Sequence, residues 1–356
     1  MAVEIKILKA YKGDCIWLRY GEYTYTNILI DSGPAKFKSG FQKIIDKVKK
    51  KGESIDLLIF THIDNDHIGG AKKYFENTNH DFEIIKEIWI NTASEVCKHF
   101  NIEYKGDKEI AMDAINQSYA PQIANKLIEF ITSKKIKVKQ LIMANEKVIP
   151  FSGAELIILS PTEKELRSMV ERWGEFNINT PFASKAYNEI DIDNLNKINK
   201  FDKDLNPYNG SSIAFIFKYG DISLLLLGDS YSDTVSTNLR RYNNGQLLDI
   251  DLVKLSHHGS SSNTNYDLLN QIKCFNYAIS TSGSNSHPSK FTIARIINCN
   301  KDNTNKIMLY CNYNWWRNKN YFTSNDKEKY LGSTIELCEL SNKMLEIKKG
   351  LLIANE

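Results

Sequence analysis

The order of strand-like and helix-like segments in this 356-residue chain predicts an α/β fold. Two observations support that prediction. Apolar runs with the length and composition of buried strands recur along the chain, and segments with apolar residues at helical spacing lie between several of them. In addition, three of the apolar runs, 55–60, 222–227 and 252–255, are followed within a few residues by histidine or aspartate.

The first part of the chain alternates between short strands and helices. Strands are expected at 4–9, 15–20, 25–31 and 55–60. A tight turn at 11–14 separates the first two. Apolar residues repeat at helical spacing through 41–51 and Gly52 follows as a C-cap, which predicts an amphipathic helix. A second helix is expected from Ala71, after two glycines.

The rest of the chain carries an insertion and a β-rich tail. Residues 92–208 are expected to be an insertion of helix and loop, with one helix at 122–134. Further strands are expected at 155–159, 212–219, 222–227, 252–255 and 275–280. The tail alternates at 306–311, 333–339 and 343–348, which suggests a small antiparallel sheet. We therefore expect a main domain, residues 1–300, and a β-rich extension, residues 301–356, packed on it.

Composition is typical of a globular protein, with 42% hydrophobic and 25% charged residues. The net charge of +3 tolerates an anionic substrate but lacks the Lys and Arg excess of a duplex-binding module. The sequence shows no secretory apolar region and no apolar run long enough to span a bilayer. Six cysteines are scattered without a CxxC pair, as in a cytoplasmic protein with reduced thiols.

The segment Thr61–Gly70 contains two imidazoles and two carboxylates within six residues, namely His62, Asp64, Asp66 and His67. The segment lies where a strand ends and a helix begins, so these side chains converge. Two close carboxylates repel each other, and burying them without a cation is costly. Imidazole and carboxylate together suit zinc, manganese or iron. The segment therefore predicts a metal site.

The pattern of an apolar run followed by candidate ligands recurs in the second half of the chain. One run leads into Asp229, and another leads into the pair His257 and His258. Taken singly, each of these could be a turn cap or a loop residue. However, five of the seven histidines fall in these turns, in the first motif or in the loop that carries His287. This concentration favours one shared site.

The order of these motifs resembles the metallo-β-lactamase fold superfamily, and within it the metallohydrolase domain of the ComEC/Rec2 competence group. The segments that carry the resemblance are Lys12–Asp14, Ile30–Gly33, Thr61–Gly70, Asn209–Ile213, Leu225–Asp229, His257–Ser260 and His287–Pro288. The resemblance implies an αββα four-layer sandwich with a helical insertion and a small C-terminal β extension. The membrane channel found beside this domain in that group is missing, so we expect a stand-alone, soluble protein.

Carried onto this sequence, the resemblance implies a centre of two divalent ions, zinc or manganese. The implied ligands are His62, Asp64, Asp66, His67, Asp229 and His258. The first two would bind one metal, Asp66, His67 and His258 the other, and Asp229 would bridge both. Asp64 stands where the superfamily usually has histidine, which makes the site richer in oxygen and favours manganese as well as zinc. A histidine for the superfamily's third motif is not evident, so the first metal is expected to be less complete.

The resemblance implies a metal-dependent hydrolase, with a phosphodiesterase or nuclease that uses a metal-activated water as the leading activity. Asp66 would hydrogen-bond or deprotonate the nucleophile. Whichever of His257 and His287 is not a ligand would protonate the leaving oxygen. Ser256 and Ser260 lie beside the histidine pair in the sequence. This proximity suggests that their hydroxyls donate to a phosphoryl oxygen of the substrate.

Two other functions stay open on sequence grounds. A hydrolase of a small ester, lactone or lactam would be favoured by a compact, closed pocket without a basic groove. A non-catalytic binding module is opposed by the complete ligand set. A nucleic acid or nucleotide substrate is supported by the segment 313–319, where aromatics alternate with cations, although Trp315 and Trp316 could instead cover a core. No membrane partner is expected, and the oligomeric state is left open, with a dimer as one option.

Overall fold

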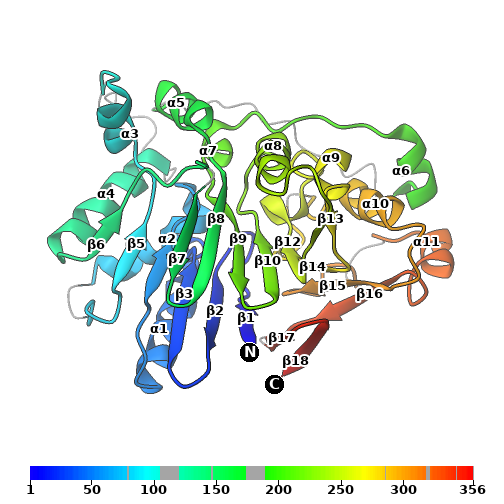
Figure 1. Cartoon of the computed structure of the whole chain (residues 1–356), viewed down its shortest axis with the longest axis horizontal. Helices are drawn as coiled ribbons and strands as arrows, with labels where there is room; N and C mark the ends of the chain where they lie inside the picture. Colours follow the sequence, from blue (N-terminus) through cyan, green and yellow to red (C-terminus); the bar gives the residue numbers. More distant parts are fainter. Residues whose placement is uncertain are drawn as a thin grey trace.

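The computed structural model describes the chain except residues 78–79, 105–119, 146, 174–188, 285, 318–320, 342 and 356. Two eight-stranded sheets face each other, and helices cover both outer faces (Figure 1). The layers therefore run helix, sheet, sheet, helix. This arrangement confirms the predicted α/β fold and the four-layer sandwich.

The first sheet combines an antiparallel half with a parallel half. In spatial order its strands are β18 (Leu351–Asn355), β17 (Met344–Lys348), β1 (Val3–Ile7), β2 (Ile16–Gly21), β3 (Tyr25–Ile30), β4 (Leu57–Ile59), β5 (Glu87–Trp89) and β6 (Lys137–Lys139). Neighbours from β18 to β3 pair antiparallel, and neighbours from β3 to β6 pair in parallel. The register between β3 and β4 places Leu29 opposite Leu58, and both side chains are fully buried.

The second sheet has the same two halves. Its strands are β16 (Ile335–Glu339), β15 (Ile307–Cys311), β14 (Asn276–Ile279), β12 (Leu252–Lys254), β10 (Ile222–Leu226), β9 (Ala214–Tyr219), β8 (Ala154–Ser160) and β7 (Val148–Phe151). Neighbours from β16 to β10 are parallel, and the others are antiparallel. A small extra sheet pairs β11 (Leu248–Asp249) with β13 (Ile272–Lys273).

Several helices bury an apolar face against a sheet, whereas α6 packs on α10 and α3 on α5. In chain order the helical elements are η1 (Ala35–Phe37), α1 (Lys38–Lys50), α2 (Asn65–Phe75), α3 (Ala93–Phe100), α4 (Ala120–Ser133), α5 (Glu163–Glu171), α6 (Ile192–Ile198), α7 (Pro207–Gly210), α8 (Ser232–Tyr242), η4 (Ser256–Gly259), α9 (Tyr266–Leu269), α10 (Lys290–Cys299) and α11 (Ser324–Lys329). Phe41 of α1, Ile68 of α2 and Leu127 of α4 share one buried cluster with the outer face of the first sheet. In the described parts of the chain, no helix has the length and apolar character needed to cross a membrane.

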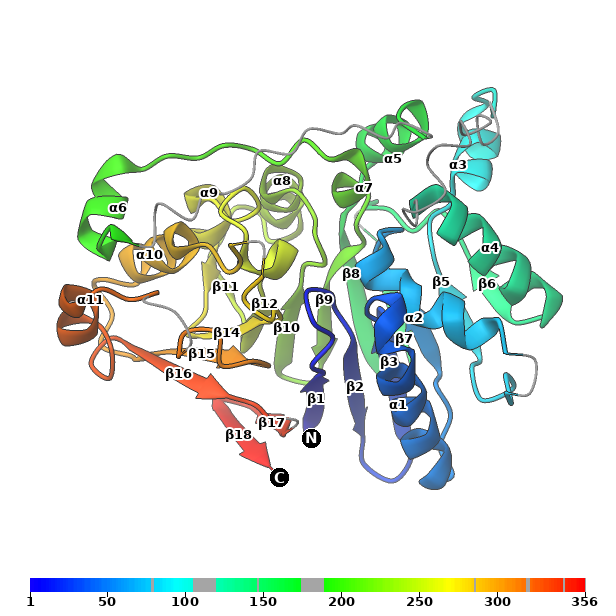
Figure 2. The same cartoon turned by 180° about the vertical axis from the view of Figure 1, so that it is seen from behind.

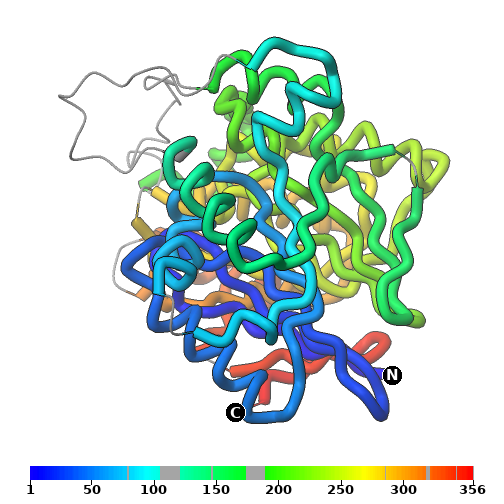
Figure 3. Tube along the Cα trace, turned by 90° about the vertical axis from the view of Figure 1, so that its left-hand side faces the viewer, coloured from blue at the N-terminus to red at the C-terminus, as the bar shows by residue number. Residues whose placement is uncertain are grey.

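The turns that carry the site motifs meet at one edge of the two sheets. The N–H of Ile213, just before β9, donates to the carbonyl of Thr61, just after β4, at 2.8 Å. A Cβ built on Gly228, after β10, would lie 3.1 Å from Cβ of Thr61. Both chain termini lie at the opposite edge (Figures 1 and 3). The fold therefore gathers the ends of β4 and β10, which belong to different sheets.

The helix α2 begins at Asn65 rather than at Ala71, so the metal motif forms its first turn. Asp64 is the residue before the helix, in an extended conformation. A Cβ on Gly70 would lie 2.2 Å from the carbonyl oxygen of Ser32. Glycine at this position therefore lets α2 approach the loop after β3 closely, and the two glycines serve packing inside the helix instead of preceding it.

The C-terminal strands exist, but they do not form a small antiparallel sheet of their own. The strands β15 and β16 extend the second sheet in parallel, and β17 and β18 extend the first. The reason is the crossover β14–α10–β15, in which a helix on the outer face returns the chain in the same direction. The boundaries at residue 300 and at 92–208 stay predictions, and residues 105–119 and 174–188 of the insertion lie outside the described chain.

Candidate metal centre

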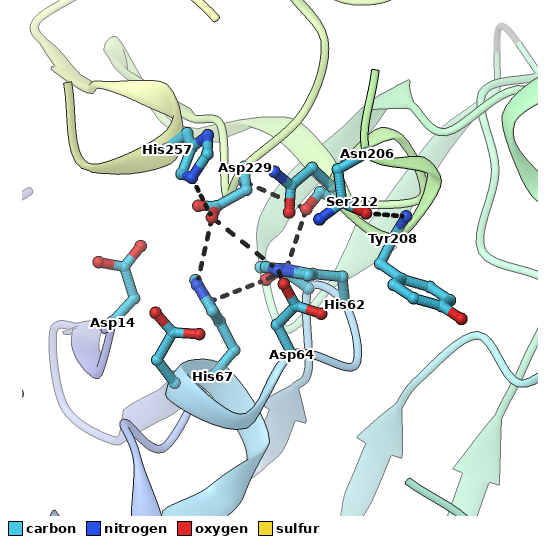
Figure 4. A network of polar contacts seen from close by, with 12 residues as sticks. Asp14, His62, Asp64, His67, Asn206, Tyr208, Ser212, Asp229 and His257 are labelled. Atoms are coloured by element: carbon cyan, nitrogen blue, oxygen red, sulfur yellow. Dashed lines mark hydrogen bonds and ion pairs between the residues drawn. The ribbon is translucent and has the colours of Figure 1, made fainter. Parts of the chain in front are cut away.

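The site residues predicted from the sequence come together where strands of both sheets end (Figure 4). They are His62 after β4, Asp64, Asp66 and His67 at the start of α2, Asp229 after β10, His257 and His258 in η4, and His287 between β14 and α10. Apolar strands anchor the backbone of each turn in the core. As a result, polar side chains from four separate segments face one small volume.

The carboxylate of Asp229 is the centre of this cluster. The Nε2 atoms of four imidazoles surround its Oδ2 atom, with His67 at 3.4 Å, His257 and His258 at 3.8 Å and His62 at 3.9 Å. Figure 4 shows three of these rings directed at Asp229. The separations are too long for good N–H···O hydrogen bonds. The side chains therefore face a common space without bonding to one another.

Several of the facing atoms are buried and have no hydrogen-bond partner in the described structure, namely His62 Nε2, His67 Nε2, His258 Nε2 and Asp229 Oδ1. Buried polar atoms without partners are rare because each one carries a desolvation penalty. Atoms that bind one tetrahedral cation at about 2.0–2.1 Å lie about 3.4 Å apart. The distances of 3.4 to 3.9 Å to Asp229 are close to that value. These residues therefore fit a divalent cation.

Of the four overlapping groups of described side chains that could hold a cation, two consist entirely of ligands predicted from the sequence. They consist of Asp66, His67 and His258, and of His62, His67 and Asp229, with all donor atoms of a group within 4.8 Å of one another. The first group contains the residues predicted for the second metal. Asp64 stands outside both groups, although its Oδ2 lies 3.8 Å from Nε2 of His62. The two metal positions are therefore unequal, and the ligand assignments themselves stay predictions.

Two of the imidazoles are held in place through their other ring nitrogen. His67 Nδ1 lies 2.8 Å from Oδ2 of Asp31, and His258 Nδ1 lies 2.9 Å from the carbonyl oxygen of Ser280. Both partners are acceptors, so the proton resides on Nδ1 and Nε2 keeps its lone pair. This is the usual arrangement for a metal-binding histidine, whose second nitrogen is held by a carboxylate or a carbonyl.

A buried ion pair stands behind His258. Asp14 Oδ1 lies 3.4 Å from His258 Nδ1, and the ammonium group of Lys254 in β12 binds the other oxygen of Asp14. Burial acts to raise the pKa of Asp14, but Lys254 and His258 outweigh it and lower the pKa. Gly13 makes this turn possible, because a Cβ there would lie 1.8 Å from the carbonyl oxygen of Asp66. Asp14 is therefore held ionised against the site.

The backbone of the histidine pair is strained. His257 and His258 have φ angles of 46° and 57°, in the left-handed region. For residues other than glycine this conformation costs about 1–2 kcal/mol each, and it is concentrated at functional sites. The Nδ1 atom of His257 lies 3.0 Å from Oδ1 of Asn263 and 3.4 Å from Oδ2 of Asp204. The strained turn thus directs both rings toward Asp229.

Burial also sets the charge of the cluster. Burial lowers the pKa of His62 to about 3, and the neighbouring His67 adds to this effect. For Asp229, burial acts to raise the pKa, but the imidazoles of His67 and His258 outweigh it and hold the pKa well below its usual range. A neutral imidazole and an ionised carboxylate are the forms that bind metals. Both groups are therefore in the state that a cation requires.

The cluster opens into a polar pocket of about 180 Å³. Besides the cluster, its walls include Lys12, Asn206, Asn209, Thr281 and Ser284. His287 also lines the pocket, with its ring centre 5.1 Å from that of His257. Its Nδ1 atom is buried and has no partner in the described structure. The three side chains predicted to be catalytic, Asp66, His257 and His287, thus share this pocket.

In this structure the hydroxyls of Ser256 and Ser260 form hydrogen bonds to the backbone of neighbouring turns. The hydroxyl of Ser256 donates to the carbonyl of Ser230 at 2.8 Å, and the hydroxyl of Ser260 accepts the N–H of Ser262 at 3.2 Å. Both side chains are buried, and neither is among the residues that line the pocket. These hydroxyls stabilise the turn, and their role in substrate binding stays a prediction.

Sequence reasoning missed the residues that stand behind the ligands. Asp14 and Asp31 lie in two motifs that carried the resemblance, so their position was a usable signal, although no role followed from it. Lys254 looked like part of an apolar strand. Asp204, which contacts His257, lies in an Asn-rich segment without any strand before it. For that residue no sequence signal pointed to the site.

Comparison with known proteins agrees with this geometry over part of the chain. The profile of the metallo-beta-lactamase superfamily matches residues 12–92, which contain the turn of Asp14, the loop of Asp31 and the first metal motif. No curated protein sequence matches the chain.

Solved structures show distant likeness. The metallo-beta-lactamase fold protein YhfI from Bacillus subtilis aligns at 10% identity and a TM-score of 0.41, covering 98% of this chain and 100% of that one. A diphosphatase of the PhnP family aligns at 12% identity and a TM-score of 0.39, covering 98% of both. A long form RNase Z from yeast aligns at 8% identity and 0.41, covering 100% of this chain and 49% of that one. Because the TM-scores lie below 0.5, these likenesses say nothing about substrate. The profile match over residues 12–92 and the two facing sheets covered by helices are consistent with a metallo-beta-lactamase fold.

Proposed function

We propose that this protein is a metal-dependent hydrolase that cleaves phosphodiesters, similar to the ComEC/Rec2 metallohydrolases. The observation that carries the proposal is the set of buried, unpartnered Nε2 atoms around Asp229, at the base of a polar pocket with Lys12 in its wall. Such atoms fit a cation, and the adjoining ammonium group fits an anionic substrate. A cytoplasmic location and a dimeric state stay predictions.

The charge of the centre supports two divalent cations. Its carboxylates are Asp14, Asp31, Asp64, Asp66, Asp204 and Asp229. In the described structure, the lysines paired with them are Lys12 and Lys254. These six carboxylates outnumber the two lysines by four, which favours the binding of divalent cations, and the mixed imidazole and carboxylate donors suit zinc or manganese.

When bound there, such cations lower the pKa of a water molecule and neutralise charge that develops on substrate oxygens. The side chain of Asp66 is 18% exposed and faces the pocket, where it would orient the attacking water. His257 has its Nδ1 proton held by Asn263 and Asp204, and its ring lines the pocket. We assign His257 to protonation of the leaving oxygen, with His287 beside it.

Lys12 favours a phosphodiester over a neutral ester. Its side chain is half exposed, and its Nζ lies 3.8 Å from Oδ2 of Asp66. It can therefore contact a non-bridging phosphate oxygen without leaving the pocket wall. The small volume of the pocket, about 180 Å³, favours the second candidate, a hydrolase of small esters, lactones or lactams. A non-catalytic binding module would not explain why several buried polar atoms lack hydrogen-bond partners.

A grid of metals and substrates tests the proposal. The purified protein, loaded with zinc or manganese, is offered bis(p-nitrophenyl) phosphate, cyclic dinucleotides, p-nitrophenyl acetate and a simple lactone. We expect metal-dependent cleavage of the phosphodiesters that is lost in His67→Ala. Cleavage of the acetate or the lactone alone would establish the second candidate instead.

The role of Lys12 is tested in the same assay. Lys12→Ala should raise the KM for the phosphodiester and leave its metal content unchanged. Lys98→Ala is the matched control, because Lys98 is 77% exposed on α3. Equal KM values for the two variants would remove Lys12 from substrate binding.

A further inference from the structure

Aromatic and basic side chains form a strip beside the mouth of the pocket. We call it the Tyr11 surface and define it as Lys9, Tyr11, Lys12, Lys36, Tyr313 and Arg317. These residues come from the turn after β1, from η1 and from the segment after β15. Figure 2 shows the turn after β1 between α2 and the strands β14 and β15. Three distant parts of the sequence thus build one surface.

Direct contacts join the members of this surface. The N–H of Tyr11 donates to the hydroxyl oxygen of Tyr313 at 2.9 Å. The Nζ atom of Lys36 lies 3.8 Å from the centre of the Tyr11 ring, and Nζ of Lys9 lies 5.4 Å from the centre of the Tyr313 ring. Both distances are within the range of a cation–π interaction. Aromatic faces and ammonium groups therefore alternate along the strip.

The strip is continuous with the metal pocket and is positively charged. Lys12 follows Tyr11 directly and lines the pocket. Lys9 and Arg317 each lie 3.6 Å from the carboxylate of Glu339, which balances one of these charges. The side chain of Arg317 is 63% exposed. The surface thus presents net positive charge that begins at the pocket wall.

Tyr11 itself is held in a strained conformation. Its φ angle is 61°, which is a genuine outlier for a bulky residue. Nevertheless its side chain is not buried, and the residue is 39% exposed. By contrast, Trp315 of the cluster expected at 313–319 is only 4% exposed and belongs to the core of the second sheet. Residues 318 and 319 lie outside the described chain. The exposed ring of this surface is therefore that of Tyr11, beside the partly buried ring of Tyr313, and not that of Trp315.

We propose that the Tyr11 surface binds a single strand of nucleic acid and leads it to the metal pocket. This inference rests on the proposed phosphodiesterase function and names its substrate class. Bases of a single strand stack on exposed aromatic rings, and cations between the rings meet the phosphates. A duplex is not accommodated in this way, because its bases are already stacked. RNA and DNA strands share the chemistry that the surface recognises.

Fluorescence anisotropy with labelled oligonucleotides tests the inference. The metal-loaded protein is titrated with cleavage-resistant phosphorothioate strands of about twelve nucleotides, within the range of sites known for single-strand binders. Tyr11→Ala should weaken binding by about 5- to 100-fold, as expected for one lost stacking contact. Tyr11→Phe should restore it. Tyr23→Ala is the matched control, because Tyr23 is 96% exposed in the β2–β3 turn, away from this surface.

A salt titration gives an independent readout. Lys36→Ala and Arg317→Ala should each reduce the slope of log K against log salt by about 0.7, the value for one phosphate contact on a single strand. Lys98→Ala should leave the slope unchanged. Affinity that is equal in Tyr11→Ala and wild type, or tighter binding of a duplex than of either single strand, overturns the inference.

The wild-type protein separates this inference from the proposed function. Hydrolysis of bis(p-nitrophenyl) phosphate without binding of oligonucleotides refutes the Tyr11 surface and keeps the phosphodiesterase. Binding of oligonucleotides without hydrolysis of any phosphodiester refutes the catalytic proposal and keeps the surface.

Discussion

Two buried charged clusters in this protein differ in how completely their atoms are paired. Around Asp229, the facing nitrogens of His62, His67 and His258 have no partner in the described structure. Between α10 and α11, Nζ of Lys290 lies 2.5 Å from Oδ2 of Asp326, and both residues are buried. In this second cluster the same carboxylate also accepts backbone N–H groups.

The second cluster is a closed structural unit. Asp326 accepts the N–H of Ile192 at 2.8 Å and the N–H of Thr323 at 2.8 Å, and Lys290 donates to the carbonyl of Ile190 at 2.7 Å. Helices α6, α10 and α11 are joined through these bonds. Burial of charge alone therefore does not identify a functional site. What marks it is burial of donor atoms that converge and stay unpaired.

Among the variants that test this contrast, Asp229→Asn should have the largest effect, a loss of metal binding. Asp229 is the predicted bridge between the two metals, and the Nε2 atoms of four imidazoles surround its Oδ2 atom. We therefore expect metal affinity to fall by more than about 100-fold, beyond the loss that a residue behind the ligands would cause. The gain in thermal stability on adding zinc or manganese should disappear with it. Equilibrium metal binding, together with melting curves at several metal concentrations, measures both effects. Wild-type affinity in this variant would refute the centre.

Asp326→Ala should produce the opposite pattern. Removing one partner of a buried pair leaves the ammonium group of Lys290 uncompensated, which costs about 3–5 kcal/mol of folding free energy. Metal content should remain that of the wild type, because the pair does not touch the site. Urea unfolding with parallel metal analysis checks the prediction. A second variant, Lys290→Met with Asp326→Leu, should recover much of the loss, since neither charge is then buried.

The sequence allowed the convergence of these side chains to be predicted because several of them follow an apolar run within three residues. The apolar strands before His62, Asp229 and His258 predict where these residues lie. Strands that end at the same edge of the sandwich bring the turns after them close together. The positions behind the ligands could not be predicted in the same way. Which carboxylate meets Nδ1 of a histidine depends on contacts between segments far apart, as for Asp14 and His258.

The fold shows the same limit. The strands of the tail were predicted from alternation, which depends only on neighbouring residues. Their pairing was wrong, because alternation does not specify whether β15 lies beside β14 in parallel or beside β16 in a separate hairpin. That choice is made by α10, whose buried face packs between them and the solvent. Likewise, the glycines before Ala71 predicted a helix boundary, whereas they lie inside the helix, where Gly70 packs closely against Ser32 and Gly69 against Ala35.

Asp31→Asn should have an intermediate effect and sharpen the contrast between ligands and their supports. Asparagine keeps the shape but removes the charge beside Nδ1 of His67. We expect metal affinity to fall by about 10- to 100-fold, as is usual for such partners, without loss of the fold. Isothermal titration with zinc gives the affinity, and Asn209→Asp serves as a control for charge changes near the pocket. An unchanged affinity would mean that the 2.8 Å contact of Asp31 with His67 does not orient the ring.

Ser260→Ala should have the smallest effect and tests whether proximity in sequence to a ligand implies a role in catalysis. The hydroxyl accepts one backbone N–H inside a turn, so its loss should cost about 1 kcal/mol of stability. The KM for a phosphodiester should stay within about twofold of the wild type, which is below 0.5 kcal/mol on the scale where 1.4 kcal/mol is tenfold. Steady-state kinetics and melting curves of this variant decide the point. A KM raised tenfold with unchanged stability would place Ser260 at the substrate, and would show that this hydroxyl, which accepts one N–H in the free protein, donates to a phosphate when substrate binds.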